Sequence, residues 1–224
     1  VAKRLLKNLQ IVKSHSSLLD KPGSFKTELE FPAEWGLGTS STFTSLLAQC
    51  AQVDPLETFK NAHGGSGYDL ACAKADGPIT YQLIENKAKV LNTTIPFDFL
   101  DELGFVYRGK KQLTSESLNL VKNKPFSDNQ IDRFNFLTDA FLQSKSLLEL
   151  EDVIEEHESL LAEHLGLTKV KQELFGELPG QVKSLGGWGG DFVLVTRLSS
   201  SKHWLEQQGF KTVFPFKQLA MVRP

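Results

Sequence analysis

Three short stretches of this sequence combine glycine with residues that handle phosphate groups or protons. The first is GLGTSS, residues 36–41, which places three hydroxyl side chains directly after two glycines. The second is HGGSGYD, residues 63–69, in which three glycines lead to Asp69. The third is KSLGGWGGD, residues 183–191, in which four glycines surround Trp188. Loops of this kind let backbone N–H groups approach an anion closely, because no side chain intervenes.

Each stretch also has a purely structural interpretation. Ser and Thr are routine helix caps, so GLGTSS predicts either a phosphate at a helix N-terminus or an ordinary capped helix. Asp69 either complements the helix that follows or holds a carboxylate beside bound phosphate. KSLGGWGGD is either a long, bulged hairpin or a loop whose backbone a ligand approaches. Three such loops at junctions between elements together favour a phosphoryl-transfer site.

The elements that position these loops alternate between helices and strands without a strict βαβ repeat. Hydrophobic spacing predicts a helix over residues 39–52, and Asp54 followed by proline predicts the start of another. Strand patterns occur in SFKTELEF, in LGFVYRG and in the two segments that flank the third stretch. We therefore expect an α+β architecture in two halves. The character of the sequence changes around residues 96–101, so the predicted domains are 1–97 and 98–224.

Composition excludes several classes of function. The formal net charge of -2 gives no reason to expect nucleic acid or a membrane surface as partner, and no apolar run could span a bilayer. Cys50 and Cys72 lack CxxC spacing and lie in apolar, helix-like surroundings, so we expect two buried free thiols and a cytoplasmic protein. The expected partner is a small-molecule substrate, and a homodimer stays open.

Taken together, the three stretches resemble the motifs of the GHMP kinases, the family named for galactokinase, homoserine kinase, mevalonate kinase and phosphomevalonate kinase. PAEWGLGTSSTF is similar to the family's PxxxGLGSSAA phosphate loop. GGSGYDLACA resembles its GxxSGxD segment, closest to the GSGFD form of phosphomevalonate kinases. KSLGGWGGDF resembles its KxSGAGGGD motif. All three occur in the family's order, and the resemblance spans residues 25–200.

The resemblance implies a fold and an activity. The fold would have two halves, the C-terminal one ferredoxin-like, with ATP and Mg2+ bound between them. The activity would be ATP-dependent transfer of the γ-phosphoryl group to a mevalonate- or phosphomevalonate-like acceptor. The alternative is a non-catalytic nucleotide- or metabolite-binding protein with the same fold.

Residue roles carry over from the matched motifs. Asp69 matches the family's catalytic aspartate, and Lys183 matches the lysine that leads into the third motif. The resemblance assigns nucleotide binding to Gly36, Leu37, Gly38, Thr39, Ser40, Ser41, Gly187, Gly189 and Gly190. It implies magnesium ligands at Ser40, Ser41 and Glu57. The implied substrate contacts are Ser66, Gly67, Lys111, Ser115, Ser117 and Trp188.

Some features depart from the family's pattern. Thr39 replaces the usual serine but keeps the hydroxyl, whereas Thr42 and Phe43 stand where small residues are usual. Trp188 occupies a position that the family keeps small, which would narrow the pocket or change the acceptor. The family's first motif, a strand with Lys and a Gly–Glu pair, is absent, and the sequence opens at Val1 in a helical pattern already under way. We therefore expect a chain that lacks its beginning, and its activity in isolation stays open.

Overall fold

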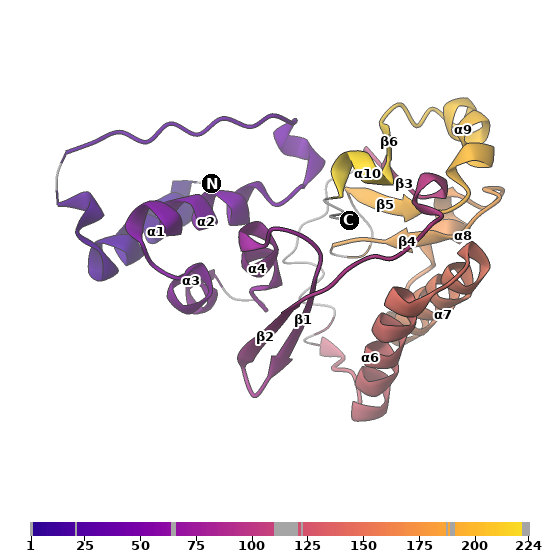
Figure 1. Ribbon diagram of the computed structural model, residues 1–224, viewed down its shortest axis with the longest axis horizontal. Coiled ribbons are helices and arrows are strands. Elements are labelled where there is room, and N and C mark those ends of the chain that lie inside the picture. The colour runs from indigo at the N-terminus through magenta and orange to yellow at the C-terminus, as the bar shows by residue number, and fades with distance from the viewer. Residues whose placement is uncertain are drawn as a thin grey trace. The chain divides into compact units, whose positions relative to one another are not determined.

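The computed structural model divides into two compact units and describes residues 2–20, 22–63, 66–109, 121, 123–186, 188 and 191–220. The first unit comprises Val1–Ala33 and Leu37–Thr94, and the second comprises Glu34–Gly36 and Ile95–Val222. A short 3-10 helix, η2 (Ala33–Trp35), thus leads from the first unit into the second. Figure 1 labels the α-helices and β-strands of both units. Among the described residues, no helix is long and apolar enough to cross a bilayer.

The first unit is mainly helical. Its elements are α1 (Ala2–His15), η1 (Ser17–Leu19), α2 (Thr39–Ala51), α3 (Pro55–His63), α4 (Tyr68–Lys74), β1 (Ile79–Ile84) and β2 (Lys87–Asn92). Asp54 caps α3 as predicted, because its Oδ1 accepts from the backbone N–H groups of Leu56 and Glu57 at 2.9 and 3.0 Å. Strands β1 and β2 form an antiparallel hairpin, and its turn residues Glu85 and Asn86 both have the positive φ that a type I′ turn requires.

Helices from four parts of the sequence share the core of the first unit. Val12 of α1, Leu47 of α2, Phe59 of α3 and Leu70 of α4 are all buried in one cluster. Burying each such side chain contributes roughly 1.5–3 kcal/mol relative to leaving it exposed. The core holds α2 against α4, and these two helices carry the ends of the first and second glycine stretches.

The second unit is built around an antiparallel sheet. Its strands are β3 (Gly104–Tyr107), β4 (Val182–Ser184), β5 (Phe192–Val195) and β6 (Val213–Pro215), in the spatial order β4-β5-β3-β6. Its helices include η3 (Leu100–Glu102), α6 (Asp128–Gln143), α7 (Leu147–Leu165), α8 (Val170–Leu174), α9 (Leu198–Gln207) and α10 (Phe216–Leu219). With α6 to α8 between β3 and β4, and α9 between β5 and β6, the connectivity is β–α–β–β–α–β, as a ferredoxin-like half requires.

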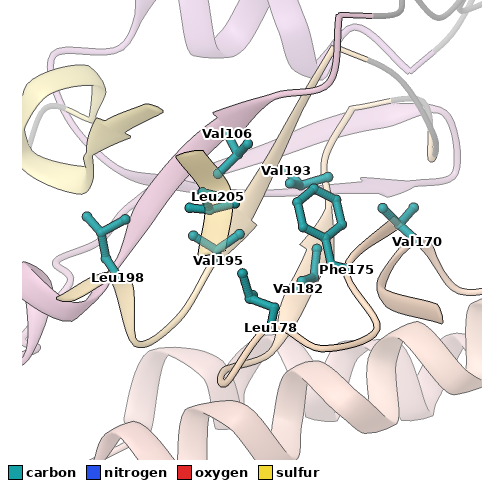
Figure 2. Close-up of a cluster of buried hydrophobic side chains, with 9 residues drawn as sticks. All are labelled: Val106, Val170, Phe175, Leu178, Val182, Val193, Val195, Leu198 and Leu205. Atoms are coloured by element: carbon teal, nitrogen blue, oxygen red, sulfur yellow. The ribbon is translucent and has the colours of Figure 1, made fainter. Parts of the chain in front are cut away.

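Alternate residues of the strands fill two cores, one on each face of the sheet. Figure 2 shows the first cluster, which consists of Val106, Val170, Phe175, Leu178, Val182, Val193, Val195, Leu198 and Leu205. Leu194 stands between two of these valines in β5 and packs in the second cluster with Leu150 and Ile154 of α7. Because side chains alternate along a strand, α7 and the α8–α9 pair cover opposite faces. Strand β5 is therefore buried on both sides.

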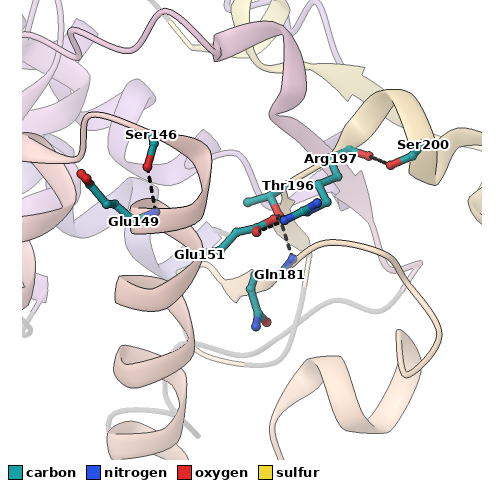
Figure 3. Close-up of polar contacts among 7 residues, drawn as sticks. All are labelled: Ser146, Glu149, Glu151, Gln181, Thr196, Arg197 and Ser200. Carbon is teal, nitrogen blue, oxygen red and sulfur yellow. Dashed lines mark hydrogen bonds and ion pairs between the residues drawn. The ribbon is translucent and has the colours of Figure 1, made fainter.

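A buried polar network holds Glu151 of α7 near the end of β5 (Figure 3). Arg197 donates from Nε and Nη2 to this carboxylate at 2.8 and 2.6 Å, and Thr196 Oγ1 donates to it at 2.6 Å. The backbone N–H of Gln181 donates in turn to Thr196 Oγ1 at 2.7 Å. Burial alone would raise the pKa of Glu151, but the hydrogen bonds from Arg197 and Thr196 outweigh it and lower the pKa. The buried charge is thus compensated within the fold.

Two expectations from the sequence were wrong. The segment SFKTELEF forms no strand, and its Phe25 and Leu29 are 51% and 48% exposed. Alternating hydrophobicity does not suffice for a strand, which also needs a partner to satisfy its backbone groups, and no described strand pairs with this segment. Cys50 and Cys72 are free thiols as predicted, but both are exposed, because neighbouring residues of α2 and α4 take the buried positions.

Candidate functional site

The first glycine stretch ends at the N-terminus of α2, where the cap is a glycine rather than a hydroxyl residue. Gly38 occupies the N-cap position with a φ of 75°, and no side chain caps the helix. The N–H groups of Ser41 and Thr42 donate to the Gly38 carbonyl at 2.9 and 3.0 Å. Thr39 and Ser40 take the first two helical positions, at the positive end of the helix dipole. The arrangement disfavours the ordinary-cap interpretation and leaves a helix end suited to an anion.

One hydrogen bond joins the first and second stretches. Ser41 Oγ, in the first turn of α2, donates to Asp69 Oδ2, in the first turn of α4, at 2.5 Å and across 28 residues of sequence. Ser41 is buried and Asp69 is exposed. Because the serine proton points at the carboxylate, the lone pairs of its oxygen remain directed elsewhere and can face a cation. Two residues that the sequence assigned to one site therefore lie together.

Ser66 and Gly67 form the approach to Asp69. Gly67 is the N-cap of α4 with a φ of 83°, a conformation that glycine adopts at little cost. The Tyr81 hydroxyl of β1 donates to the Ser66 carbonyl, which ties this loop to the hairpin. Burial raises the pKa of Tyr81, and the charge of Asp69 raises it further, so the phenol keeps its proton. Tyr81 belongs to none of the three stretches, and its sequence context carries no signal for this contact.

The Ser41–Asp69 pair supplies oxygen ligands of the kind that Mg2+ prefers. Among the described residues, no three or more His, Cys, Asp or Glu side chains gather. One hydroxyl and one carboxylate would leave most positions around such an ion to other oxygen ligands, such as phosphate or water. Ser40 lies half-buried in the same helical turn as Ser41. Glu57 lies in the first turn of α3. No hydrogen bond between described residues links its carboxylate to Ser41 or Asp69, and its metal role stays a prediction.

Trp35 anchors the residues before the first stretch on the sheet of the second unit. Its ring centroid lies 5.2 Å from that of Phe214, 5.8 Å from that of Phe192 and 6.3 Å from that of Tyr107. The Tyr107 hydroxyl also donates to the carbonyl of Glu34 at 3.1 Å. The large apolar ring directly before a glycine loop is the sequence signal that indicates such an anchor, and the motif comparison missed it.

Gly36 brings the start of the first stretch against the end of the third. Its φ is 67°, and a Cβ at this position would lie 2.2 Å from Asp191 Cγ, so only glycine fits beside this carboxylate. Asp191 has a φ of 49°, and its carbonyl accepts from the backbone N–H of Arg108 at 2.8 Å. The two stretches therefore meet within the second unit, at the end of the sheet where β3 ends and β5 begins.

The third stretch is described in part. Trp188 and Gly186 have φ values of 54° and 57°, and for a bulky residue such as tryptophan this conformation is strained. Trp188 lines a pocket of about 20 Å3 with Ser184 and with residues of α7 and α8, which is room for a water molecule rather than a substrate. The predicted site residues outside the described part of the chain are Gly187, Gly189, Gly190, Lys111, Ser115 and Ser117.

Lys183 lies on β4 and faces α7. Its Nζ is 3.2 Å from His157 Nδ1 and 3.4 Å from Glu158 Oε1, and Ser184 Oγ donates to the same glutamate oxygen at 3.0 Å. Burial lowers the pKa of Lys183, and the charge of Glu158 acts in the opposite direction. The lysine thus belongs to an internal ion pair of the second unit, whereas Asp69 belongs to the first. Its catalytic role stays a prediction.

Comparisons with known proteins identify the kind of fold. A scan against protein-family models and a search of curated proteins found no match. Among solved structures, the chain matches a crystal structure of L. major mevalonate kinase in complex with R-mevalonate. The match has a TM-score of 0.56 and 15% sequence identity, and it covers 96% of this chain and 77% of that chain. The fold is a distant likeness of mevalonate kinase.

At this level of identity the likeness concerns the fold alone. It agrees with the α+β class expected from the sequence and with a distant GHMP-kinase-like fold. The likeness to mevalonate kinase was found by structure, whereas the three stretches point to the same family through residue types.

Proposed function

We propose that this chain is an ATP-dependent kinase that transfers the γ-phosphoryl group of ATP to a small, mevalonate- or phosphomevalonate-like acceptor. The three stretches that resemble GHMP kinase motifs and the distant likeness of the fold to mevalonate kinase support the proposal. The observation that carries it is the 2.5 Å hydrogen bond between Ser41 Oγ and Asp69 Oδ2. It joins the two residues that the resemblance assigns to the metal and to the reacting proton.

Phosphoryl transfer depends mainly on positioning and on stabilising charge, because the protein performs little covalent chemistry. The first turn of α2 fits that task, since its N–H groups can donate to phosphate oxygens and its positive end favours their charge. When bound, Mg2+ would neutralise charge on the β- and γ-phosphates of ATP, and Ser41 and Asp69 are the residues that would hold it. The other residues proposed to contact the nucleotide here are Gly36, Leu37, Gly38, Thr39 and Ser40.

The role of Asp69 depends on the acceptor. An alcohol acceptor must lose its proton as its oxygen attacks, and the exposed Asp69 carboxylate would accept that proton. A phosphate acceptor is already ionised, so Asp69 would instead hold Ser41 and the cation in position. The GSGYD form of the second stretch, closest to that of phosphomevalonate kinases, leans towards the phosphate acceptor.

A coupled ADP-release assay tests the proposal. The protein is given ATP, Mg2+ and, in turn, mevalonate, phosphomevalonate, homoserine or galactose, and turnover is expected with one of the first two. If the acceptor is the alcohol mevalonate, Asp69→Asn should lower kcat at least about a hundredfold, the scale of losing a proton-transfer group. Asp20→Asn is the matched control, because it changes an exposed carboxylate of the same unit and should leave kcat unchanged. Clear ATP binding without turnover of any acceptor would contradict the kinase proposal.

That same outcome would support a second candidate, a non-catalytic nucleotide- or metabolite-binding protein. Trp188 favours this candidate, because a bulky residue at a φ of 54° stands where the family keeps a small one. The Ser41–Asp69 pair opposes it, since simple nucleotide binding requires no carboxylate beside the phosphate loop.

A further inference from the structure

Arg108 lies at the glycine-rich end of the sheet in the second unit. It follows Tyr107, the last residue of β3, and its backbone N–H donates to the carbonyl of Asp191 at 2.8 Å. In the register of the sheet Tyr107 faces Phe192, so Arg108 stands beside the loop that joins β4 to β5. Gly36 lies against Asp191 at the same end. Arg108 therefore neighbours both glycine stretches that this unit contains.

The Arg108 guanidinium is buried, and two of its nitrogens have no partner among the described residues. The side chain is 4% exposed. Within the described part of the chain, Nε and Nη1 have no hydrogen-bond partner. Nη2 lies 3.8 Å from Glu173 Oε2, beyond hydrogen-bond distance, and the Glu173 side chain is 54% exposed, so water screens its charge. Burial lowers the pKa of Arg108 against the effect of Glu173, yet a guanidinium keeps its charge in proteins.

Two other buried charges of this unit are compensated. Glu151 accepts hydrogen bonds from Arg197 and Thr196, and Glu158 accepts one from Ser184 beside Lys183. Burying a charge without such partners is costly. A guanidinium with open donors is the group that proteins use to bind the oxygens of carboxylates and phosphates.

We propose that Arg108 binds an oxyanion, a carboxylate or a phosphate, of the acceptor substrate. That the acceptor carries this oxyanion rests on the proposed function, whereas oxyanion binding rests on the surroundings of Arg108 alone. The planar fork of donors matches two oxygens of either group. The residues from Leu37 to Ser41, which we propose to contact the nucleotide, belong to the first unit, whereas Arg108 belongs to the second, and we assign Arg108 to the acceptor.

Calorimetric titration of the intact protein tests this proposal. The probes are phosphomevalonate, inorganic phosphate, acetate and a non-hydrolysable ATP analogue, each titrated separately. Arg108→Met should weaken binding of phosphomevalonate, and of phosphate or acetate, by about tenfold to a hundredfold, as expected for losing a hydrogen bond to a charged group. Affinity for the ATP analogue should not change. Arg133→Met is the matched control, because this exposed arginine is already paired with Glu156 and its loss should change no affinity.

Several outcomes would overturn the proposal. Unchanged affinities for phosphomevalonate and phosphate in Arg108→Met would do so, as would a wild-type protein that binds no oxyanion probe. Loss of affinity for the ATP analogue in place of phosphomevalonate would refute the assignment to the acceptor. If the thermal unfolding curve shows that Arg108→Met does not fold, the same titrations are made with Arg108→Lys. Lysine keeps the charge but loses the fork, so an intermediate loss is expected and an unchanged affinity refutes the proposal.

The ADP-release assay separates this proposal from the kinase activity. Turnover with an unchanged KM for the acceptor in Arg108→Met would refute the role of Arg108 and leave the kinase standing. Absence of turnover with every acceptor, together with phosphate binding that depends on Arg108, would refute the kinase and leave an oxyanion site.

Discussion

The two ends of the sheet in the second unit each carry an arginine, and the two arginines differ in their partners. Where β5 ends, Arg197 donates twice to Glu151, and Thr196 donates to the same carboxylate. Where β5 begins, Arg108 is 4% exposed, and two of its nitrogens have no partner among the described residues. A satisfied polar network stabilises and specifies a fold, whereas open donors keep binding capacity. We infer that one end of the sheet serves stability and the other serves a ligand.

Replacing each arginine by methionine tests most directly whether the two ends of the sheet differ in their contribution to stability. Arg197→Met leaves Glu151, whose side chain is 7% exposed, without its cation, and should lower the free energy of unfolding by about 3 kcal/mol. Arg108→Met removes a charge that the fold leaves largely unpaired, so the free energy of unfolding should stay equal or rise. Urea denaturation measures both values. Equal losses in the two variants would show that the ends do not differ.

Removing the aromatic anchor at the ligand-binding end should have the next largest effect. Trp35 is half-buried among three aromatic rings of the sheet, so Trp35→Ala should cost about 2 kcal/mol, less than a fully buried tryptophan would. Trp35→Phe keeps a ring and should recover most of this loss. Thermal unfolding of the two variants provides the measurement. If alanine and phenylalanine behave alike, the ring contacts do not hold this segment.

Acid should weaken the paired end of the sheet by a smaller amount. The pKa of Glu151 is lowered from its ordinary value of 4.5, although burial opposes this, so its stabilising effect is complete above that pH and is lost as the pH falls below it. Glu151→Gln cannot titrate and should flatten this part of the pH profile. The midpoint of thermal unfolding, followed from neutral pH to about pH 3, reports the difference. Parallel profiles for both proteins would mean that Glu151 does not cause the acid sensitivity.

The smallest effect distinguishes two glycines of the same loop. Gly36 and Gly38 both have positive φ, so alanine at either position should cost about 1 kcal/mol in backbone strain. A Cβ at Gly36 would also meet Asp191, whereas a Cβ at Gly38 meets nothing within 4 Å. Gly36→Ala should therefore be the more destabilising variant in urea denaturation. In a double-mutant cycle, adding Asp191→Gly should remove the additional loss of stability that Gly36→Ala shows over Gly38→Ala. If that additional loss persists, contact with Asp191 is not its cause.

Local patterns predicted helices α2 and α3 and three strands of the second unit, β3, β4 and β5. The spacing over α2, and Asp54 followed by proline at the start of α3, act within a few residues, so the sequence alone contains their cause. The strand predicted in SFKTELEF was wrong, because a strand depends on a partner that no local pattern supplies.

The residues of the candidate site also differ in whether the sequence could predict them. That Ser41 and Asp69 lie together could be predicted only through the resemblance to a family, since 28 residues separate them and no spacing rule connects them. Tyr81 and Arg108 could not be predicted. Their significance comes from what surrounds them in space. Tyr81 contacts a loop carbonyl, and two nitrogens of Arg108 have no partner among the described residues.

Because the three residues Glu34–Gly36 belong to the second unit, the chain cannot be cut at one point into fragments that match the two units. The chain crosses between the units before these residues, directly after them and again at Ile95, so no single cut separates the units. A fragment beginning at Ile95 would contain all four strands described for the sheet. It would lack Trp35, so the three aromatic rings that Trp35 contacts would be exposed. A synthetic peptide spanning residues 32–38 should therefore bind such a fragment and restore its solubility. We therefore expect the second unit to assemble from these two pieces rather than from one continuous fragment.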